Sequence, residues 1–291
     1  MTALVDGISL GIYEKALIGD PDEEKRDWNA WFAQVPQAGF SFVDLSIDES
    51  EQREARLQWT PRQCVAIRHA ADNAGTTIGG ICLSIHRKVG PGSADPAVRQ
   101  KARDIMARGL QVCHDLGVGV IQIAGYYCYY EDPHPDAERW YAQMLADAVP
   151  MAARLGVIMG IENVDGHDVT SIAKAMEFVH QVNSPWLQVY PDLGNIVEQG
   201  KDPLADLEAG RNHMVAMHAK DVRQGEPRRV DMGTGIVDWD LSFQVLKAQG
   251  WAGRLMIEMW NDDAPDSTQR SMRARDFIAA KARGAGIPIV A

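Results

Sequence analysis

Four ionisable side chains each follow an apolar run in the second half of the sequence. Glu162 follows VIMGI, Asp192 follows WLQVYP, His218 follows MVAM and Glu258 follows WAGRLMI. Such runs are typical of strands buried on both faces, and each ionisable group stands where its strand would end. Two Glu, one Asp and one His form a mixed oxygen and nitrogen donor set that suits Mn²⁺, Zn²⁺, Co²⁺ or Mg²⁺.

A carboxylate at a strand end can also face solvent or cap the next helix, and this alternative stays open for any one of the four. Four such groups in succession, at the same place in neighbouring strands, favour a shared task. We therefore predict a site for one divalent metal ion, with room for water or substrate oxygens, formed by Glu162, Asp192, His218 and Glu258.

The elements that must position these groups repeat along the chain. Helical stretches end in glycine and a short apolar run follows within a few residues, as at Gly39, Gly75, Gly117, Gly156 and Gly250. Glycine just past a helix supplies the left-handed conformation that ends it. Strands are predicted to begin near residues 7, 41, 77, 119, 157, 186, 214 and 254. Helices are predicted at about 23–38, 60–74, 96–116, 136–155, 170–182, 203–212, 239–249 and 266–284.

Eight alternating strand–helix units predict an α/β fold, a (β/α)₈ barrel that forms a single domain over residues 1–291. An open doubly wound sheet is the alternative, but no GxGxxG follows the first strand. Long connections at 85–95, 125–135 and 220–238 all leave the C-terminal ends of strands, which is the face of a barrel that carries active sites. The metal site is predicted on that face.

Charge and composition argue against several classes of function. The chain has 29 basic and 40 acidic residues among 291, which gives a net charge of −11. This balance argues against partners such as nucleic acid or an anionic membrane, because both attract basic surfaces. The four cysteines form no CxxC pair, and the sequence shows neither a signal-peptide pattern nor an apolar run of the ~18 residues that span a bilayer. We expect a cytoplasmic protein with reduced thiols.

Six segments between the first and the last predicted strand carry a family resemblance. They are GIYEKAL at 11–17, CLSIHRK at 82–88, IQIAGYYCYY at 121–130, VYPDLGN at 189–195, HAKD at 218–221 and IEMW at 257–260. Together they resemble the L-ribulose-5-phosphate 3-epimerase family, whose members are also called L-xylulose-5-phosphate 3-epimerases, among the xylose isomerase-like TIM barrels. The resemblance implies an isomerase of carbohydrate metabolism that acts on a small sugar phosphate and that holds its metal through the four strand-end residues. Relatives of this kind often pair through the catalytic face, so a homodimer is an open expectation.

Epimerisation at C3 of L-ribulose 5-phosphate or L-xylulose 5-phosphate removes a proton next to a carbonyl group and returns one on the opposite face. The enediolate must be stabilised, which a divalent metal does as a Lewis acid, and an acid or base must stand on each side of the carbon. We expect Glu162 and Glu258 to be these catalytic groups, and Asp192 and His218 mainly to hold the metal.

An acidic protein with an anionic substrate needs a local positive patch. Lys220 and Arg228 are the candidates we favour for the phosphate, and the backbone N–H groups of residues 233–235 offer a second cradle. His86, just after the third strand, is expected to contact the substrate. Asn195 is also expected there, at a position where related epimerases of unphosphorylated ketoses have His, which favours a sugar phosphate.

Other functions on the same barrel stay open. The segment IENVDG at 161–166 is closer to the free-ketose pattern, so a free-ketose 3-epimerase or an aldose–ketose isomerase is the first alternative. A non-catalytic sugar-binding barrel is the second. A nuclease like endonuclease IV would need further His ligands and a basic surface, and the sequence shows neither.

Overall fold

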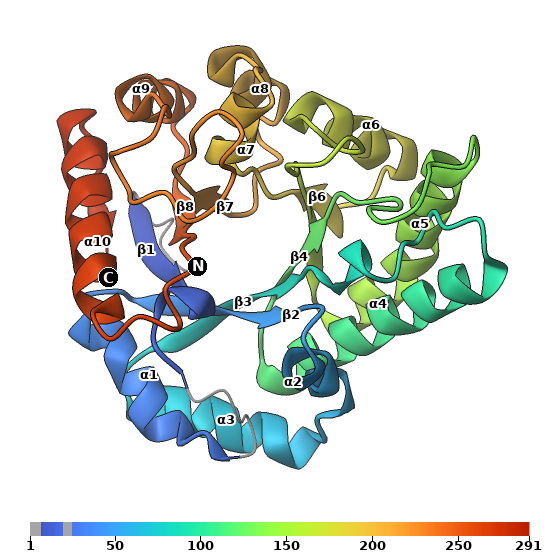
Figure 1. Ribbon diagram of the computed structural model, residues 1–291, viewed down its shortest axis with the longest axis horizontal. Coiled ribbons are helices and arrows are strands. Elements are labelled where there is room, and N and C mark those ends of the chain that lie inside the picture. Colours follow the sequence, from blue (N-terminus) through green and yellow to red (C-terminus); the bar gives the residue numbers. More distant parts are fainter. Residues whose placement is uncertain (1–6, 20–24, 291) are drawn as a thin grey trace.

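The strands form one parallel sheet that curls into a barrel (Figure 1). The computed structural model describes residues 7–19 and 25–290. The strands are β1 (Ile8–Tyr13), β2 (Phe42–Ile47), β3 (Thr77–Leu83), β4 (Val120–Ala124), β5 (Ile158–Glu162), β6 (Leu187–Val189), β7 (Met217–Ala219), β8 (Gly253–Ile257) and β9 (Ile289–Val290). Hydrogen-bonded neighbours follow the order β6-β5-β4-β3-β2-β1-β8-β7, and the short β9 pairs with β1. The predicted (β/α)₈ fold is confirmed.

The barrel closes at a seam between β6 and β7. Val189 forms a parallel bridge with Met214, and Asp192 forms one with His218. The His218 N–H donates to the Pro191 carbonyl at 2.8 Å. Closure of the barrel therefore places two of the four predicted metal ligands side by side.

A ring of helices covers the outside of the strands (Figure 1). They are α1 (Trp28–Gln37), α2 (Glu51–Glu54), α3 (Pro61–Asn73), α4 (Pro96–Leu116), α5 (Ala137–Leu155), α6 (Ile172–Val182), α7 (Leu193–Glu198), α8 (Pro203–Ala209), α9 (Trp239–Gln249) and α10 (Ser267–Gly284). The five glycines predicted to end helices all have positive φ, between +65° and +83°. None of the helices within the described residues is long and apolar enough to cross a membrane.

Three boundaries differ from the prediction. Helix α1 begins at Trp28 rather than near 23, because the Asp27 carboxylate caps it by accepting from the Asn29 and Ala30 N–H groups. Residues 20–24, where that prediction began, lie outside the described residues. Helix α8 ends at Ala209 and β7 begins only at Met217. The residues between them form a turn, in which the His213 carbonyl and the Val215 N–H hydrogen-bond to the backbone of Val189 at the seam. Helices α2 and α7 are too short to give a periodic pattern in the sequence.

Candidate metal centre

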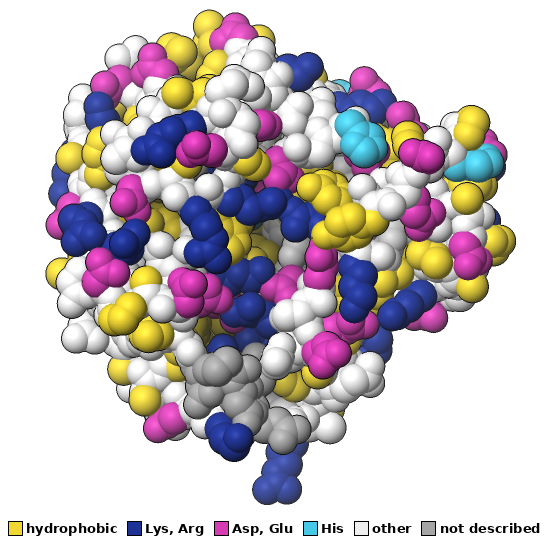
Figure 2. Space-filling view, in the orientation of Figure 1, with side chains coloured by type: hydrophobic (Ala, Val, Ile, Leu, Met, Phe, Trp, Pro, Cys, Tyr) yellow, Lys and Arg dark blue, Asp and Glu magenta, His cyan; other side chains and the backbone are white. Residues whose placement is uncertain are grey.

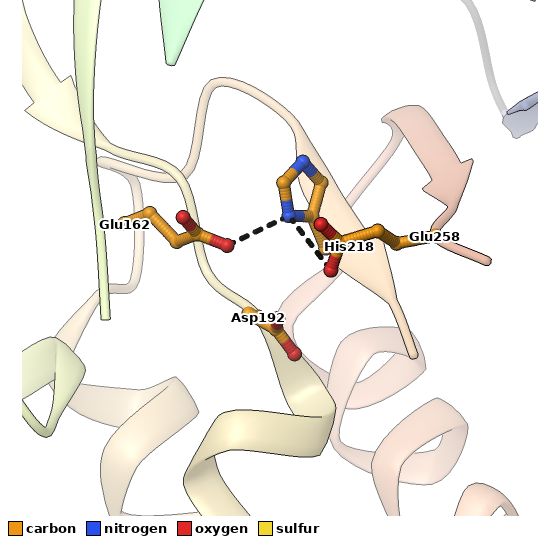
Figure 3. Close-up of side chains that lie close together, drawn as sticks. All are labelled: Glu162, Asp192, His218 and Glu258. Atoms are coloured by element: carbon orange, nitrogen blue, oxygen red, sulfur yellow. Dashed lines mark hydrogen bonds and ion pairs between the residues drawn. The ribbon is translucent and has the colours of Figure 1, made fainter. Parts of the chain in front are cut away.

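Four side chains converge where β5, β6, β7 and β8 end. Glu162 is the last residue of β5, Asp192 caps α7 after β6, His218 lies in β7 and Glu258 follows β8. One ligand atom of each lies within 4.8 Å of the others. His218 Nδ1 is 2.8 Å from Glu162 Oε1 and 3.7 Å from Glu258 Oε2, so the two glutamates approach the imidazole from different sides (Figure 3). The structure thus brings together all four residues predicted to bind metal.

The donor set of this metal cluster fits a divalent cation. The four side chains are at most 10% exposed, and among the described residues Glu258 Oε2 has no hydrogen-bond partner. Buried carboxylates repel one another and need a compensating positive charge. A divalent cation that accepts oxygen and nitrogen ligands would supply that charge.

The pKa shifts within the cluster also indicate that its carboxylates need a compensating positive charge. Burial raises the pKa of Glu162 to about 7. The attraction of His218 lowers this pKa, and the repulsion of Glu258 and Asp192 raises it further. Burial by itself lowers the pKa of His218, but the Glu258 and Glu162 carboxylates outweigh it and raise the pKa to about 9. Burial also raises the pKa of Asp192. Protons and a metal ion therefore compete for the same carboxylates.

Residues that sequence reasoning missed hold His218 and Glu162 in place. The Gln122 amide, in the middle of β4, donates to Glu162 Oε2 at 2.5 Å. The ring of Tyr190 lies edge-on to the His218 imidazole, with centroids 4.6 Å apart. Cys82 Sγ lies 3.8 Å from His218 Nε2. Burial raises the pKa of the Cys82 thiol, and nearby carboxylates add to the shift, so the sulfur stays protonated. The only sequence signal for these roles was a polar residue within an apolar strand, as at Gln122.

Two of the predicted substrate contacts bond to Asp192. The Asn195 side chain donates to Asp192 Oδ2 at 2.9 Å and accepts from Lys220 Nζ at 2.7 Å. Lys220 Nζ also lies 2.8 Å from Asp192 Oδ2. Burial alone would lower the pKa of Lys220, but Asp192 and Glu258 raise it, so the ammonium group stays charged. Asn195 and Lys220 both line the cavity, on its floor next to the cluster.

The cluster opens into a cavity of about 80 Å³ whose lining includes several cationic side chains. Lys15, Arg87, Lys220 and Arg228 all line it. Figure 2 shows Lys and Arg side chains around the hollow at the centre of this face. Arg228 Nη2 lies 2.5 Å from Asp165 Oδ2, and Arg87 Nη2 lies 4.0 Å from Asp165 Oδ1. In a protein with a net charge of −11, this cavity therefore places four cationic side chains beside the carboxylates of Glu162, Asp165 and Glu258.

His86 does not line this cavity, contrary to expectation. Its imidazole is fully buried, Nε2 lies 3.1 Å from the Ala102 carbonyl oxygen in α4, and burial lowers its pKa to about 4. His86 belongs to a 3₁₀ turn (Ile85–Arg87), in which consecutive side chains point in different directions. The neutral imidazole of His86 therefore points into the protein interior, and the charged side chain of Arg87 points toward the cavity.

The glycine-rich segment at 233–235 is also not a free phosphate cradle. The N–H groups of Gly233 and Gly235 donate to the Asp221 carboxylate at 2.8 and 3.0 Å. Asp221 is buried and stabilises the turn as an internal anion. A substrate phosphate would have to displace it to use these groups.

Another buried carboxylate, Glu14, lies on the same face of the barrel, directly after β1. Glu14 accepts hydrogen bonds from the Ser46 N–H at 2.6 Å and from Arg53 Nε and Arg56 Nη2 at 2.9 Å each. Burial would raise its pKa, but the Arg56 and Arg53 guanidinium groups outweigh burial and hold the pKa of Glu14 well below its usual range. We call Glu14, Arg53 and Arg56 the arginine cage.

Known proteins resemble this chain over nearly its whole length. The family model described as xylose isomerase-like TIM barrel matches residues 32–280. The L-ribulose-5-phosphate 3-epimerase UlaE of Shigella boydii serotype 18 is 38% identical over 283 residues, which cover 96% of this chain and 97% of that protein. UlaE of Escherichia coli strain K12 shows the same identity and the same coverage.

Solved structures share the fold at lower identity. A D-psicose 3-epimerase from Clostridium cellulolyticum H10, determined with D-tagatose, superposes with a TM-score of 0.79 at 16% identity, covering 94% of this chain and 99% of that one. An L-ribulose 3-epimerase superposes with a TM-score of 0.78 at 18% identity, covering 95% of each chain. These structures support the barrel fold alone.

Proposed function

This chain belongs to the L-ribulose-5-phosphate 3-epimerase family of the xylose isomerase-like TIM barrels, and we propose that it is a metal-dependent epimerase that inverts C3 of a ketopentose 5-phosphate. The substrates we propose are L-ribulose 5-phosphate and L-xylulose 5-phosphate. The observation that carries the proposal is one cavity that contains both the metal cluster and the guanidinium groups of Arg87 and Arg228. Such a cavity offers a site for a cation and a site for an anion.

Glu162 and Glu258 are the proton-transfer groups in this proposal. They reach the cluster from β5 and β8 and approach His218 Nδ1 from different sides (Figure 3). Inversion requires one group to remove the C3 proton and another to deliver a proton to the opposite face. A divalent cation held by the four residues supplies, when bound, Lewis-acid stabilisation of the negative charge that develops as the C3 proton leaves. Gln122 holds the Glu162 carboxylate in one orientation through its hydrogen bond to Oε2.

We assign Arg228 and Arg87 to the phosphate. Both line the cavity, and both present guanidinium N–H groups toward one carboxylate, that of Asp165. Guanidinium groups match the oxygens of a phosphate with paired hydrogen bonds. Lys220 and Asn195 lie beside Asp192 on the cavity floor, so we propose that they contact sugar oxygens rather than the phosphate. His86 has no part in the proposal.

The cytoplasm is the compartment that fits this function. Cys64, Cys82, Cys113 and Cys128 are all free thiols, and all four are buried. Free thiols are typical of a reducing compartment, where sugar phosphates also occur.

A substrate panel tests the proposal. Mn²⁺-loaded protein is incubated with L-ribulose 5-phosphate, L-xylulose 5-phosphate and free L-ribulose, and the products are identified by NMR. We expect the two phosphates to interconvert with kcat/KM about 100-fold above that for the free ketose, because the guanidinium–phosphate hydrogen bonds are charge-assisted. Conversion of free ketoses alone would support the free-ketose alternative. No conversion of any sugar would support a binding protein.

A further inference from the structure

His218 presents one ring nitrogen to the metal cluster and the other to a cysteine. Nδ1 faces Glu162 and Glu258, whereas Nε2 lies 3.8 Å from Cys82 Sγ, within the range of a weak hydrogen bond to sulfur. Strands β3 and β7 lie on opposite sides of the barrel, so Cys82 meets His218 across its interior. If Nδ1 donates its lone pair to a cation, the ring proton must be on Nε2. Cys82 Sγ is then the acceptor that faces this proton.

Tyr190 fixes the plane of the same ring. Its ring lies at 63° to the His218 imidazole, and its hydroxyl donates to Asp44 Oδ2 at 2.9 Å. Asp44 is buried in β2, and a Cβ at Gly80 would lie only 2.9 Å from that oxygen. A Cβ at Gly160 would lie 3.0 Å from Tyr190 Cβ. Close packing around both partners leaves the tyrosine little freedom to turn away.

We propose that Cys82 and Tyr190 are positioning residues for metal binding. Cys82 Sγ accepts a hydrogen bond from the Nε2–H group of His218. Tyr190, held by Asp44, sets the ring plane, so that Nδ1 points at the cation. The proposal rests on the metal site of the proposed function, but it does not depend on which sugar is the substrate. Sulfur is a weaker acceptor than the carboxylate or carbonyl that commonly backs a metal-binding histidine. His218 is therefore oriented without being made strongly electron-rich, which leaves the cation more of its Lewis acidity.

Titration with Co²⁺ tests the role of Cys82 without any sugar. Wild type, Cys82→Ala and the control Cys64→Ala are titrated while the visible d–d absorption is recorded. Cys64 is a suitable control because it is equally buried, in α3. We expect Cys82→Ala to bind Co²⁺ about tenfold more weakly and to shift the absorption band, since outer partners of metal-binding histidines typically contribute 10- to 100-fold to affinity. Cys64→Ala should match wild type in both.

A second pair of variants tests Tyr190. Tyr190→Phe removes the bond to Asp44 but keeps the ring, so we expect Co²⁺ binding about threefold weaker, and Tyr190→Ala should weaken it further, into the range of Cys82→Ala. In the Zn²⁺-loaded wild type, ¹⁵N NMR should show His218 with its proton on Nε2. A proton found on Nδ1 would contradict the proposal.

The outcomes separate the two claims. If wild type does not bind Co²⁺, the metal-dependent function itself is wrong. If wild type binds Co²⁺ and Cys82→Ala binds it equally well with the same band, the function stands and the positioning role is wrong. A merely structural role would lower the thermal stability of Cys82→Ala, as in Cys64→Ala, without moving the spectrum, and this result would also overturn the proposal.

Discussion

Two buried glutamates on one face of the barrel have opposite electrostatics. Glu14 follows β1 and Glu162 ends β5, on opposite sides of the barrel. In the arginine cage, Arg56 and Arg53 hold the pKa of Glu14 well below its usual range despite burial. In the metal cluster, burial raises the pKa of Glu162 to about 7, and the attraction of His218 does not offset it.

The difference shows that the partner, not the residue type or its place in the barrel, decides the role of a buried carboxylate. The arginines are permanently charged and hold the pKa of Glu14 well below its usual range, so Glu14 is an ion at neutral pH. The cluster has three carboxylates against one lysine and one histidine. Its negative charge therefore favours the reversible binding of a cation. The cage should therefore matter for folding and the cluster for catalysis.

The largest effect is expected in the cluster. Glu258→Gln should lower epimerisation by about 1,000-fold, because it removes one of the two proton-transfer groups, and it should still bind Mn²⁺ through the other three residues. The unfolding free energy without metal should change little, since the repulsion of Glu162 and Asp192 is lost together with the attraction of His218 and Lys220. Steady-state kinetics, Mn²⁺ calorimetry and urea unfolding measure the three quantities. Near-full activity would remove Glu258 from the mechanism.

The cage should show the reverse pattern. Glu14→Gln should lower the unfolding free energy by about 3 kcal/mol, because the buried Arg56 and the partly buried Arg53 lose the carboxylate charge of Glu14. Urea unfolding measures the loss. Glu54→Gln is the matched control: Glu54 pairs with Lys88 and Lys101 at the surface, so its loss should stay below about 1 kcal/mol. Equal losses in the two variants would mean that the cage is no more important than a surface ion pair.

Arg228 and Arg229 are neighbours in the sequence, but only Arg228 lines the cavity, so the two can be compared directly. Arg228→Met should raise KM for the phosphorylated ketose by about 30-fold with little change for the free ketose, because it removes a charge-assisted contact to phosphate. Arg229→Met is the control, since Arg229 is 61% exposed and pairs with Asp263 outside the cavity. An equal rise in KM in both variants would point to general electrostatic attraction instead of a specific contact.

The smallest expected effect is a pH dependence of the cage. Because the pKa of Glu14 is lowered on folding from its usual 4.5, its contribution to stability is complete above about pH 4.5 and declines as the pH falls toward the folded-state pKa. The difference in unfolding free energy between wild type and Glu14→Gln should therefore be constant from pH 7 to about pH 5 and shrink below it. A difference that grows on acidification would contradict the lowered pKa.

Local sequence patterns predicted the fold and the metal cluster because both depend on order along the chain. Each apolar run leads to an ionisable residue in or just after the C-terminal part of its strand, so Glu162, Asp192, His218 and Glu258 were expected to share one face once the barrel was predicted. Contacts between distant strands left no such pattern. Tyr190 bonds Asp44 across 146 positions and Cys82 meets His218 across 136.

Two candidate substrate contacts differ in place or partner from the expectation, because of local conformation that residue type does not encode. His86 and Arg87 are neighbours in one turn, and only the turn geometry decides which faces the cavity. The glycines at 233 and 235 looked like an anion cradle, and they are one, but the anion is Asp221 of the same chain. The arginine cage was missed because its members come from separate segments, with 42 positions between Glu14 and Arg56.

The central claim is that the metal cluster removes and returns the C3 proton of a ketopentose 5-phosphate. Proton NMR of L-ribulose 5-phosphate in deuterated water with the Mn²⁺-loaded protein, the chelator-stripped protein and the stripped protein after Mn²⁺ is restored tests it most directly. The account predicts that the C3 hydrogen is replaced by deuterium, that stripping the metal stops the exchange and that Mn²⁺ restores it. Exchange at an unchanged rate in the stripped protein, or no exchange in the loaded one, would contradict it.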